Sequence, residues 1–244
     1  MANPVAHAFA TGVANLAGTA TTGTMAVSAG DSVYAFISFG TAGGQTLTSV
    51  TDSESGTWTK VGSLTGASGT NTQMYIYVRD NVSASATFTA TAHFSANTVG
   101  AIGICDVTGA NSSGSFDTIG PGHTSATYTT NQVVSDSVTP TNGSDLLMAV
   151  LSVPVTNFTS NKGTYGTPAG MNLGASAIGA SGTAASRGVG IYWVNGSGTG
   201  SQNISGEMSS DGTYNGYAML AVSIQPPASP GSSGHLLSLL GVGS

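Results

Sequence analysis

The chain has very few charged residues. Asp, Glu, Lys and Arg make up only 6% of its 244 residues, whereas they are roughly 25% of an average globular domain. The net charge is −6, and the basic residues Lys60, Arg79, Lys162 and Arg187 are scattered. Binding to nucleic acid or to anionic lipid needs clustered basic side chains. The sequence therefore predicts no nucleic-acid partner and no electrostatic docking on a membrane.

Long apolar runs are also missing. No stretch approaches the roughly 20 apolar residues of a membrane-spanning helix, so we expect no membrane insertion. Hydrophobic residues still make up 39% of the chain and fall in alternating runs, which argues against disorder. Residues 1–7 lack the basic and apolar segments of a secretory signal, which favours export within a particle over secretion.

Residues typical of catalytic or metal sites are sparse. Cys105 is the single cysteine, which excludes an intrachain disulfide, and its apolar surroundings predict a small buried side chain. The histidines show no zinc-like spacing, and the matched positions of His7 and His123 suggest a shared structural role. The acids form no recognisable pair, although a carboxylate pair formed only in space stays open. We expect no cofactor, no metal and no enzymatic activity.

One turn, residues 52–58, carries two acids, Asp52 and Glu54, in front of Trp58. Oxygen-rich loops of this kind can bind Ca²⁺, but the spacing does not match an EF-hand and two carboxylates are few. A plain hairpin turn is the preferred interpretation.

In place of helical periodicity the chain has short strand-like segments separated by turns of Gly, Ser, Asn and Thr. In residues 87–94, Thr occupies one face and Phe and Ala the other, as in an antiparallel sheet with one solvated side. We expect strands near residues 5–10, 22–28, 32–39, 46–51, 57–62, 72–79, 86–94, 99–107, 132–138, 146–154, 174–179, 187–194, 202–208 and 216–225. The pattern predicts an all-β fold, an antiparallel β-sandwich of the jelly-roll or Ig-like kind.

Two series of these segments match in the same order, which indicates an internal duplication. The offset stays between 114 and 117 residues, as shown by the matches of 29–38 with 143–152, 73–78 with 189–194 and 100–107 with 217–224. We expect one β-sandwich repeat in 1–117 and a second in 118–225. Because the junction is short, the two halves should be in contact, either as separate sandwiches or as one shared double sheet.

Residues 226–244 have a different character, because a Pro/Gly/Ser linker leads into a Leu-rich tail. The apolar side chains of the tail are Leu236, Leu237, Leu239, Leu240 and Val242. Such a cluster should not stay exposed. It either folds back on its own sandwich or docks into a neighbouring subunit or partner as a tether, and we favour the tether over lipid insertion.

Aromatic residues supply a second set of candidates. Trp58 and Trp193 lie in strand-like segments and are interpreted as anchors of the core. If exposed beside Tyr75, Tyr77 or Tyr192, they would instead form a platform on which sugar rings stack. Tyr75 and Tyr77 share a parity along their strand, and so they should face the same way.

Three segments, 30–36, 48–62 and 104–109, resemble Gly/Ser/Thr-rich β-sandwich modules of phage virion-accessory proteins and bacterial surface proteins. In these modules the strand that corresponds to residues 104–109 more often carries an acidic residue followed by an aromatic one, whereas this chain has Cys-Asp-Val there. The resemblance implies a structural or adhesive role and transfers no active-site residues. We therefore expect a virion structural protein (capsid decoration, spike or tail-associated) that binds copies of itself or a capsid or tail protein. The alternatives are a carbohydrate-binding or adhesive module, extracellular or on a cell surface, and a subunit of an extracellular fibre.

Overall fold

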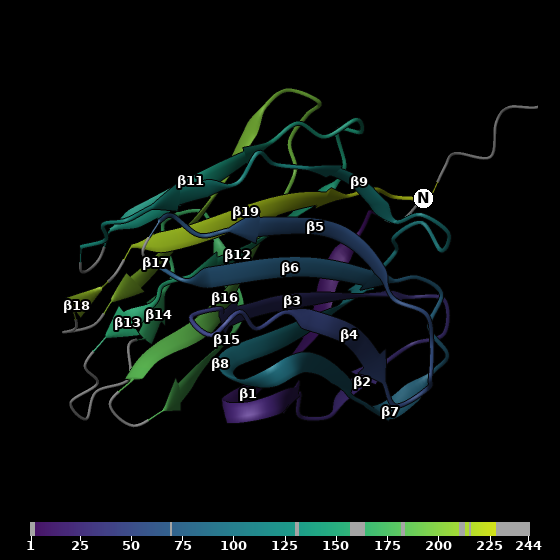
Figure 1. Cartoon of the computed structure of the whole chain (residues 1–244). Coiled ribbons are helices and arrows are strands. Elements are labelled where there is room, and N and C mark those ends of the chain that lie inside the picture. Colours follow the sequence, from purple (N-terminus) through teal and green to yellow (C-terminus); the bar gives the residue numbers. More distant parts are fainter. Residues whose placement is uncertain are drawn as a thin grey trace, which may run out of the picture.

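The computed structural model describes residues 3–68, 70–129, 132–156, 164–181, 184–209, 213–214 and 216–227. Within these ranges the chain forms nineteen strands and no helix (Figure 1). Every strand pairing among them is antiparallel. The all-β antiparallel fold predicted from the sequence is thereby confirmed.

The first large sheet is built from the N-terminal part of the chain. Its strands, in spatial order, are β1 (Val5–Thr21), β8 (Ala90–Thr108), β3 (Ser32–Gly40), β6 (Thr72–Arg79) and β5 (Thr59–Thr65), with β4 (Leu47–Asp52) paired to β8. A separate two-stranded sheet consists of β2 (Met25–Val27) and β7 (Ser85–Phe88).

The second large sheet is built from the rest of the chain. Its strands, in spatial order, are β10 (His123–Ser125), β19 (Tyr217–Ile224), β12 (Leu146–Ser152), β16 (Ala184–Asn195), β13 (Val155–Thr156) and β18 (Thr213–Tyr214). Two further strands join it, β9 (Phe116–Ile119) beside β19 and β15 (Asn172–Ser181) beside β16. A three-stranded sheet contains β11 (Val133–Val138), β17 (Gln202–Ser209) and β14 (Thr164–Gly166).

The centres of the two large sheets have the same pairing order. Strand β3 lies between β8 and β6, and β12 lies between β19 and β16.

The expected match of His7 with His123 does not extend to the residues around them. His7 on β1 lies beside Asp106, whereas His123 on β10 pairs with Met219 and contacts the ring of Tyr217. The two histidines therefore do not share one structural role.

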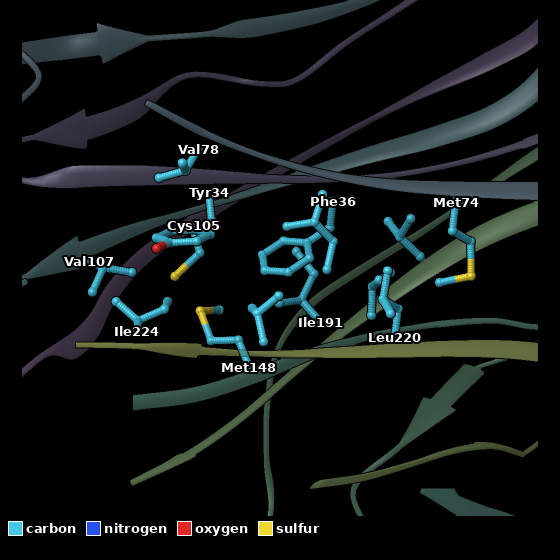
Figure 2. Close-up of a cluster of buried hydrophobic side chains, with 14 of the residues drawn as sticks. Tyr34, Phe36, Met74, Val78, Cys105, Val107, Met148, Ile191, Leu220 and Ile224 are labelled. Carbon is cyan, nitrogen blue, oxygen red and sulfur yellow. The ribbon is translucent and has the colours of Figure 1, made fainter. Parts of the chain in front are cut away.

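The central hydrophobic cluster lies between the two large sheets, and Figure 2 shows side chains from both sheets pointing toward one another. Tyr34 and Phe36 come from β3, and Met148 comes from β12. A second cluster covers the opposite face of the first sheet, and a third lies between the second sheet and β11, β14 and β17. Strands β3, β12 and β19 are therefore buried on both faces, which explains their nearly continuous apolar sequences.

Candidate functional site

The exposed large hydrophobic side chains of the described residues lie on edge strands. Strand β1 carries Val5, Val13 and Leu16, β9 carries Ile119, and β11 carries Val133. Among the described strands, each of these three is hydrogen-bonded to a single neighbour. Apolar side chains beside unpaired backbone groups are typical of edges to which another chain can add. These five residues are called the edge residues below.

Among the edge residues, Leu16 has an unusual backbone conformation. Its φ is 55°, in the left-handed region that residues other than Gly, Asn and Asp rarely adopt. It lies between the pairs Asn15–Val99 and Ala17–Thr98, where the register of β1 against β8 shifts, and is therefore the extra residue of a β-bulge. Its side chain is 57% exposed. Because backbone strain of this kind concentrates at functional sites, Leu16 is the leading candidate on β1.

Tyr75 and Tyr77 form a second candidate surface on the first large sheet. Alternation along β6 turns Met74 and Ile76 into the central cluster and leaves both tyrosines half-buried on the opposite face. Their ring centroids are 6.3 Å apart, and Lys60 Nζ lies 5.4 Å from the centroid of the Tyr75 ring. Desolvation raises the pKa of Tyr77. Two neighbouring rings with a cation beside them suit stacking against a sugar.

The other predicted aromatic residues are distributed differently. Trp58 is half-buried and packs against the same cluster as Tyr75 and Tyr77. Trp193 is half-buried against the central cluster of the molecule. Tyr192 is fully buried, and its hydroxyl donates to the backbone carbonyl of Glu207 at 2.7 Å. The inclusion of Tyr192 in a sugar-stacking platform is therefore wrong, because its ring has no exposed face.

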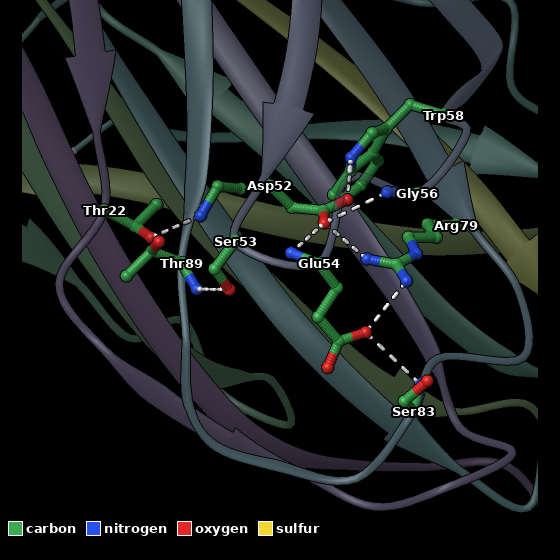
Figure 3. A network of polar contacts seen from close by, with 10 residues as sticks. Thr22, Asp52, Ser53, Glu54, Gly56, Trp58, Arg79, Ser83 and Thr89 are labelled. Atoms are coloured by element: carbon green, nitrogen blue, oxygen red, sulfur yellow. Dashed lines mark hydrogen bonds and ion pairs between the residues drawn. The ribbon is translucent and has the colours of Figure 1, made fainter.

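The acidic turn at 52–58 holds a guanidinium group (Figure 3). Arg79 Nη1 lies 2.6 Å from Asp52 Oδ1, and Arg79 Nη2 donates to Glu54 Oε2 at 2.8 Å. The Trp58 Nε1–H donates to Asp52 Oδ2 at 2.7 Å. A Cβ atom at Gly56 would lie 2.0 Å from Arg79 Nε, so a larger residue here would displace the guanidinium from the turn. The turn connects β4 to β5, which pair with β8 and β6, so it is not the expected hairpin.

Two buried acids have strongly raised pKa values. Asp106 on β8 is fully buried, with its Oδ2 3.1 Å from His7 Nδ1, and burial, aided by nearby Asp31, raises its pKa to about 6. Asp145, just before β12, is 1% exposed, and burial together with Asp117 raises its pKa to about 7. Two pairs of acids thus form in space, Asp31 with Asp106 and Asp117 with Asp145. The members of each pair are far apart in the sequence, and no local motif marks them.

Cys105 is buried, as expected, and desolvation raises the pKa of its thiol. Within the ranges that the structure describes, no three His, Cys, Asp or Glu side chains converge as metal ligands. No helix in the same ranges is long and apolar enough to span a membrane. The apolar tail at 236–242, predicted to be a tether, lies outside the described residues.

Comparison of the chain with protein-family models, with curated proteins and with solved structures found no match. The edge residues and the two surface tyrosines therefore have to be interpreted from their geometry alone.

Proposed function

We propose that the chain is a non-enzymatic structural protein of a virion surface, a capsid decoration, spike or tail-associated protein that assembles through its β-sheet edges. The observation that carries the proposal is the gathering of the exposed large hydrophobic side chains of the described residues on β1, β9 and β11. With only 6% charged residues, two such edges meet little like-charge repulsion when they approach. The partners are copies of this chain or a shell or tail protein.

The proposal includes an internal duplication of a β-sandwich repeat of jelly-roll or Ig-like type, with one repeat in residues 1–117 and a second in 118–225, either as separate sandwiches or as one shared double sheet. It is supported by the pairing at the sheet centres. Ala35 of β3 pairs with Ile104 and Tyr77, and Ala149 of β12 pairs with Ala221 and Tyr192. These positions follow the offset of 114 to 117 residues found in the sequence.

The proposed tether rests on the sequence of 226–244. Deletion of these residues is expected to leave the fold of the rest of the chain intact and to abolish attachment to the particle. Attachment is measured by co-sedimentation of purified particles with the full and the shortened chain. Equal co-sedimentation of both chains would rule out the tether.

The role of the edges is tested with Leu16→Asn, because Asn tolerates a positive φ and removes the apolar side chain. Burial of one Leu in a contact is worth about 2 kcal/mol, so the variant should associate at least about tenfold more weakly. The measurement is the mass distribution by analytical ultracentrifugation. The matched control is Thr199→Asn in the exposed turn between β16 and β17. A monomeric wild type contradicts assembly through copies of this chain, and unchanged assembly of Leu16→Asn contradicts the role of the β1 edge.

A carbohydrate-binding or adhesive role is the second candidate, favoured by the arrangement of Tyr75, Tyr77 and Lys60. A glycan array with Tyr77→Ala tests it, and Tyr192→Phe in the core is the control. Selective loss of glycan binding with an unchanged melting temperature supports this role. Ordered polymers of the purified wild-type chain would instead indicate a fibre subunit.

A further inference from the structure

Asp117 on β9 and Asp145 before β12 form a carboxylate pair at one end of the second large sheet. Asp117 accepts hydrogen bonds from the backbone N–H of Thr141 at 2.7 Å, from the Thr141 hydroxyl at 2.6 Å and from the Ser223 hydroxyl at 3.2 Å. Burial alone would raise the pKa of Asp117, but these donors lower it below its usual value. Asp117 is therefore ionised at neutral pH.

Asp145 has the opposite environment. Its side chain is 1% exposed, and neither of its carboxylate oxygens accepts a well-formed hydrogen bond from the described residues, although the Ser223 and Asn142 side chains lie close enough to lower its pKa. Its nearest charged neighbour is Asp117, which acts on it as a like charge. A buried ionised carboxylate without a positive partner is strongly unfavourable. The two oxygens of Asp145 thus face a second acid with only weak donors beside them.

The described residues supply no positive charge to this pair. Lys60 lies over a tyrosine ring, Arg79 is bound to the acids of the turn at 52–58, and Arg187 donates to backbone carbonyls. The described histidines are also bonded to other groups: His7 to Asp106, His93 to Thr51 and His123 to the carbonyl of Ser135. Within the described residues, therefore, no basic side chain neutralises Asp117 or Asp145, and either a proton or a bound cation can do so.

The corresponding place in the first large sheet is built differently. Asp31 precedes β3 as Asp145 precedes β12, and it interacts with Asp106. There the third group is the His7 ring, 3.1 Å from Asp106, and an imidazole can carry a positive charge. In the second sheet the group beside Asp145 is the carboxylate of Asp117. The first site contains a base that can offset its acids, whereas the second has two acids and no base among the described residues.

We propose that Asp117 and Asp145 bind a divalent cation of the hard, oxygen-seeking class, Ca²⁺, with the Ser223 hydroxyl and the Asn142 side chain as neutral ligands. Ser223 and Asn142 both interact with Asp145. Ca²⁺ accepts carboxylate, hydroxyl and amide oxygens in flexible geometry, whereas Mg²⁺ demands a strict octahedron and gives up water reluctantly. A buried set of protein oxygens therefore favours Ca²⁺. Solvent reaches the site beside Asp117, Thr141 and Asn142, which are not fully buried.

The test is the melting temperature of the full chain, stripped with chelator, at pH 7.5 with and without Ca²⁺, together with calorimetric titration. Dissociation constants of roughly 0.1–1 mM are typical of extracellular Ca²⁺ sites, so about 10 mM Ca²⁺ should raise the melting temperature by about 5 °C. Mg²⁺ at the same concentration should give a clearly smaller shift. An equal response to Mg²⁺ overturns the assignment to Ca²⁺.

Asp145→Asn and Asp117→Asn are expected to abolish the Ca²⁺-dependent shift and the titration heat. Asp106→Asn, in the site that carries its own histidine, is the matched control and should keep both. Absence of a shift and of heat in the wild type overturns the proposal and leaves a proton shared between the two acids. An unchanged Ca²⁺ response in Asp145→Asn also overturns it. If this variant does not fold, Asp117→Asn and the wild-type titration decide the outcome.

Discussion

The guanidinium of Arg187 donates a hydrogen bond of 3.2 Å to the backbone carbonyl of Asn71. The same nitrogen also donates to the carbonyl of Thr70, and the other terminal nitrogen donates to the carbonyl of Ser186. Arg187 is 4% exposed, and burial lowers its pKa to about 10. A charged side chain from β16 of the second large sheet therefore holds the turn between β5 and β6 of the first.

Replacing Arg187 with Met is expected to lower the free energy of unfolding by about 3 kcal/mol, because the substitution removes the hydrogen bonds of a buried charged donor to the carbonyls of Thr70, Asn71 and Ser186. Urea denaturation measures the change. Lys60→Met, which removes an exposed cation, is the control and should change stability by less than about 1 kcal/mol. Equal effects of the two substitutions would show that the carbonyl contacts of Arg187 contribute little.

Asp52→Asn should destabilise the chain by about 2–3 kcal/mol, since the carboxylate serves Arg79, the Trp58 indole and the backbone N–H of Glu54 at once. Glu54→Gln removes an acid that is more exposed and should cost about 1 kcal/mol. Urea unfolding followed by tryptophan fluorescence compares the two variants. A larger loss in Glu54→Gln than in Asp52→Asn would contradict the central position of Asp52.

The fully buried Asp106 makes stability fall as pH rises. Its pKa is about 6 in the folded chain against an ordinary value of 3.8. Between these values the unfolded chain has lost its proton and the folded chain keeps it, so the unfolding free energy declines from about pH 4 to about pH 6 and then levels. The groups that face Asp106 are His7 and Asp31.

Asp106→Asn removes this contribution. As the pH rises from about 4 to about 6, the free energy of unfolding of the variant should increase by about 2 kcal/mol relative to that of the wild type. Denaturant melts at a series of pH values give the difference curve. A flat difference across this range would mean that Asp106 titrates at its ordinary pKa in the folded chain.

Gly179→Ala is expected to cost at least about 2 kcal/mol. A Cβ atom at this position would lie 2.2 Å from the carbonyl oxygen of Gly100 and 2.8 Å from that of Ala14, and neither backbone atom can swing aside. Gly198→Ala is the control, because nothing lies within 4 Å of its Cβ. The control should be neutral or stabilising by about 0.5 kcal/mol. Similar melting temperatures of the two variants would contradict the close contact of β15 with the first sheet.

The strand pattern could be predicted from the sequence because hydrophobic side chains and turn residues alternate locally. The boundaries of β1 and β8 could not be predicted in this way. The segments expected at 86–94 and 99–107 belong largely to one long strand, β8, and β1 extends to Thr21 instead of ending near residue 10. The bulges between β1 and β8 absorb residues that break the alternation, so the two strands stay paired where the sequence suggests a turn.

The polar sites were harder to predict. The acids of the turn at 52–58 are close in sequence and were recognised, but their partner Arg79 comes from another strand. Asp145 has no unusual neighbours in the sequence, and only the pairing of β9 with β19 and of β19 with β12 brings Asp117 to it. Leu16 has no sequence signal either, since its conformation depends on the register of β1 against β8.

Strand β19, residues Tyr217–Ile224, lies in the middle of the second sheet and is buried along its whole length. During synthesis, β3 and β6 leave the ribosome long before this strand exists, and Phe36 and Ile76 then lack the neighbours that cover them in the finished chain. The molecule cannot close until residue 224 is available. A chain that ends before this strand consequently exposes part of the apolar face of its first sheet to solvent.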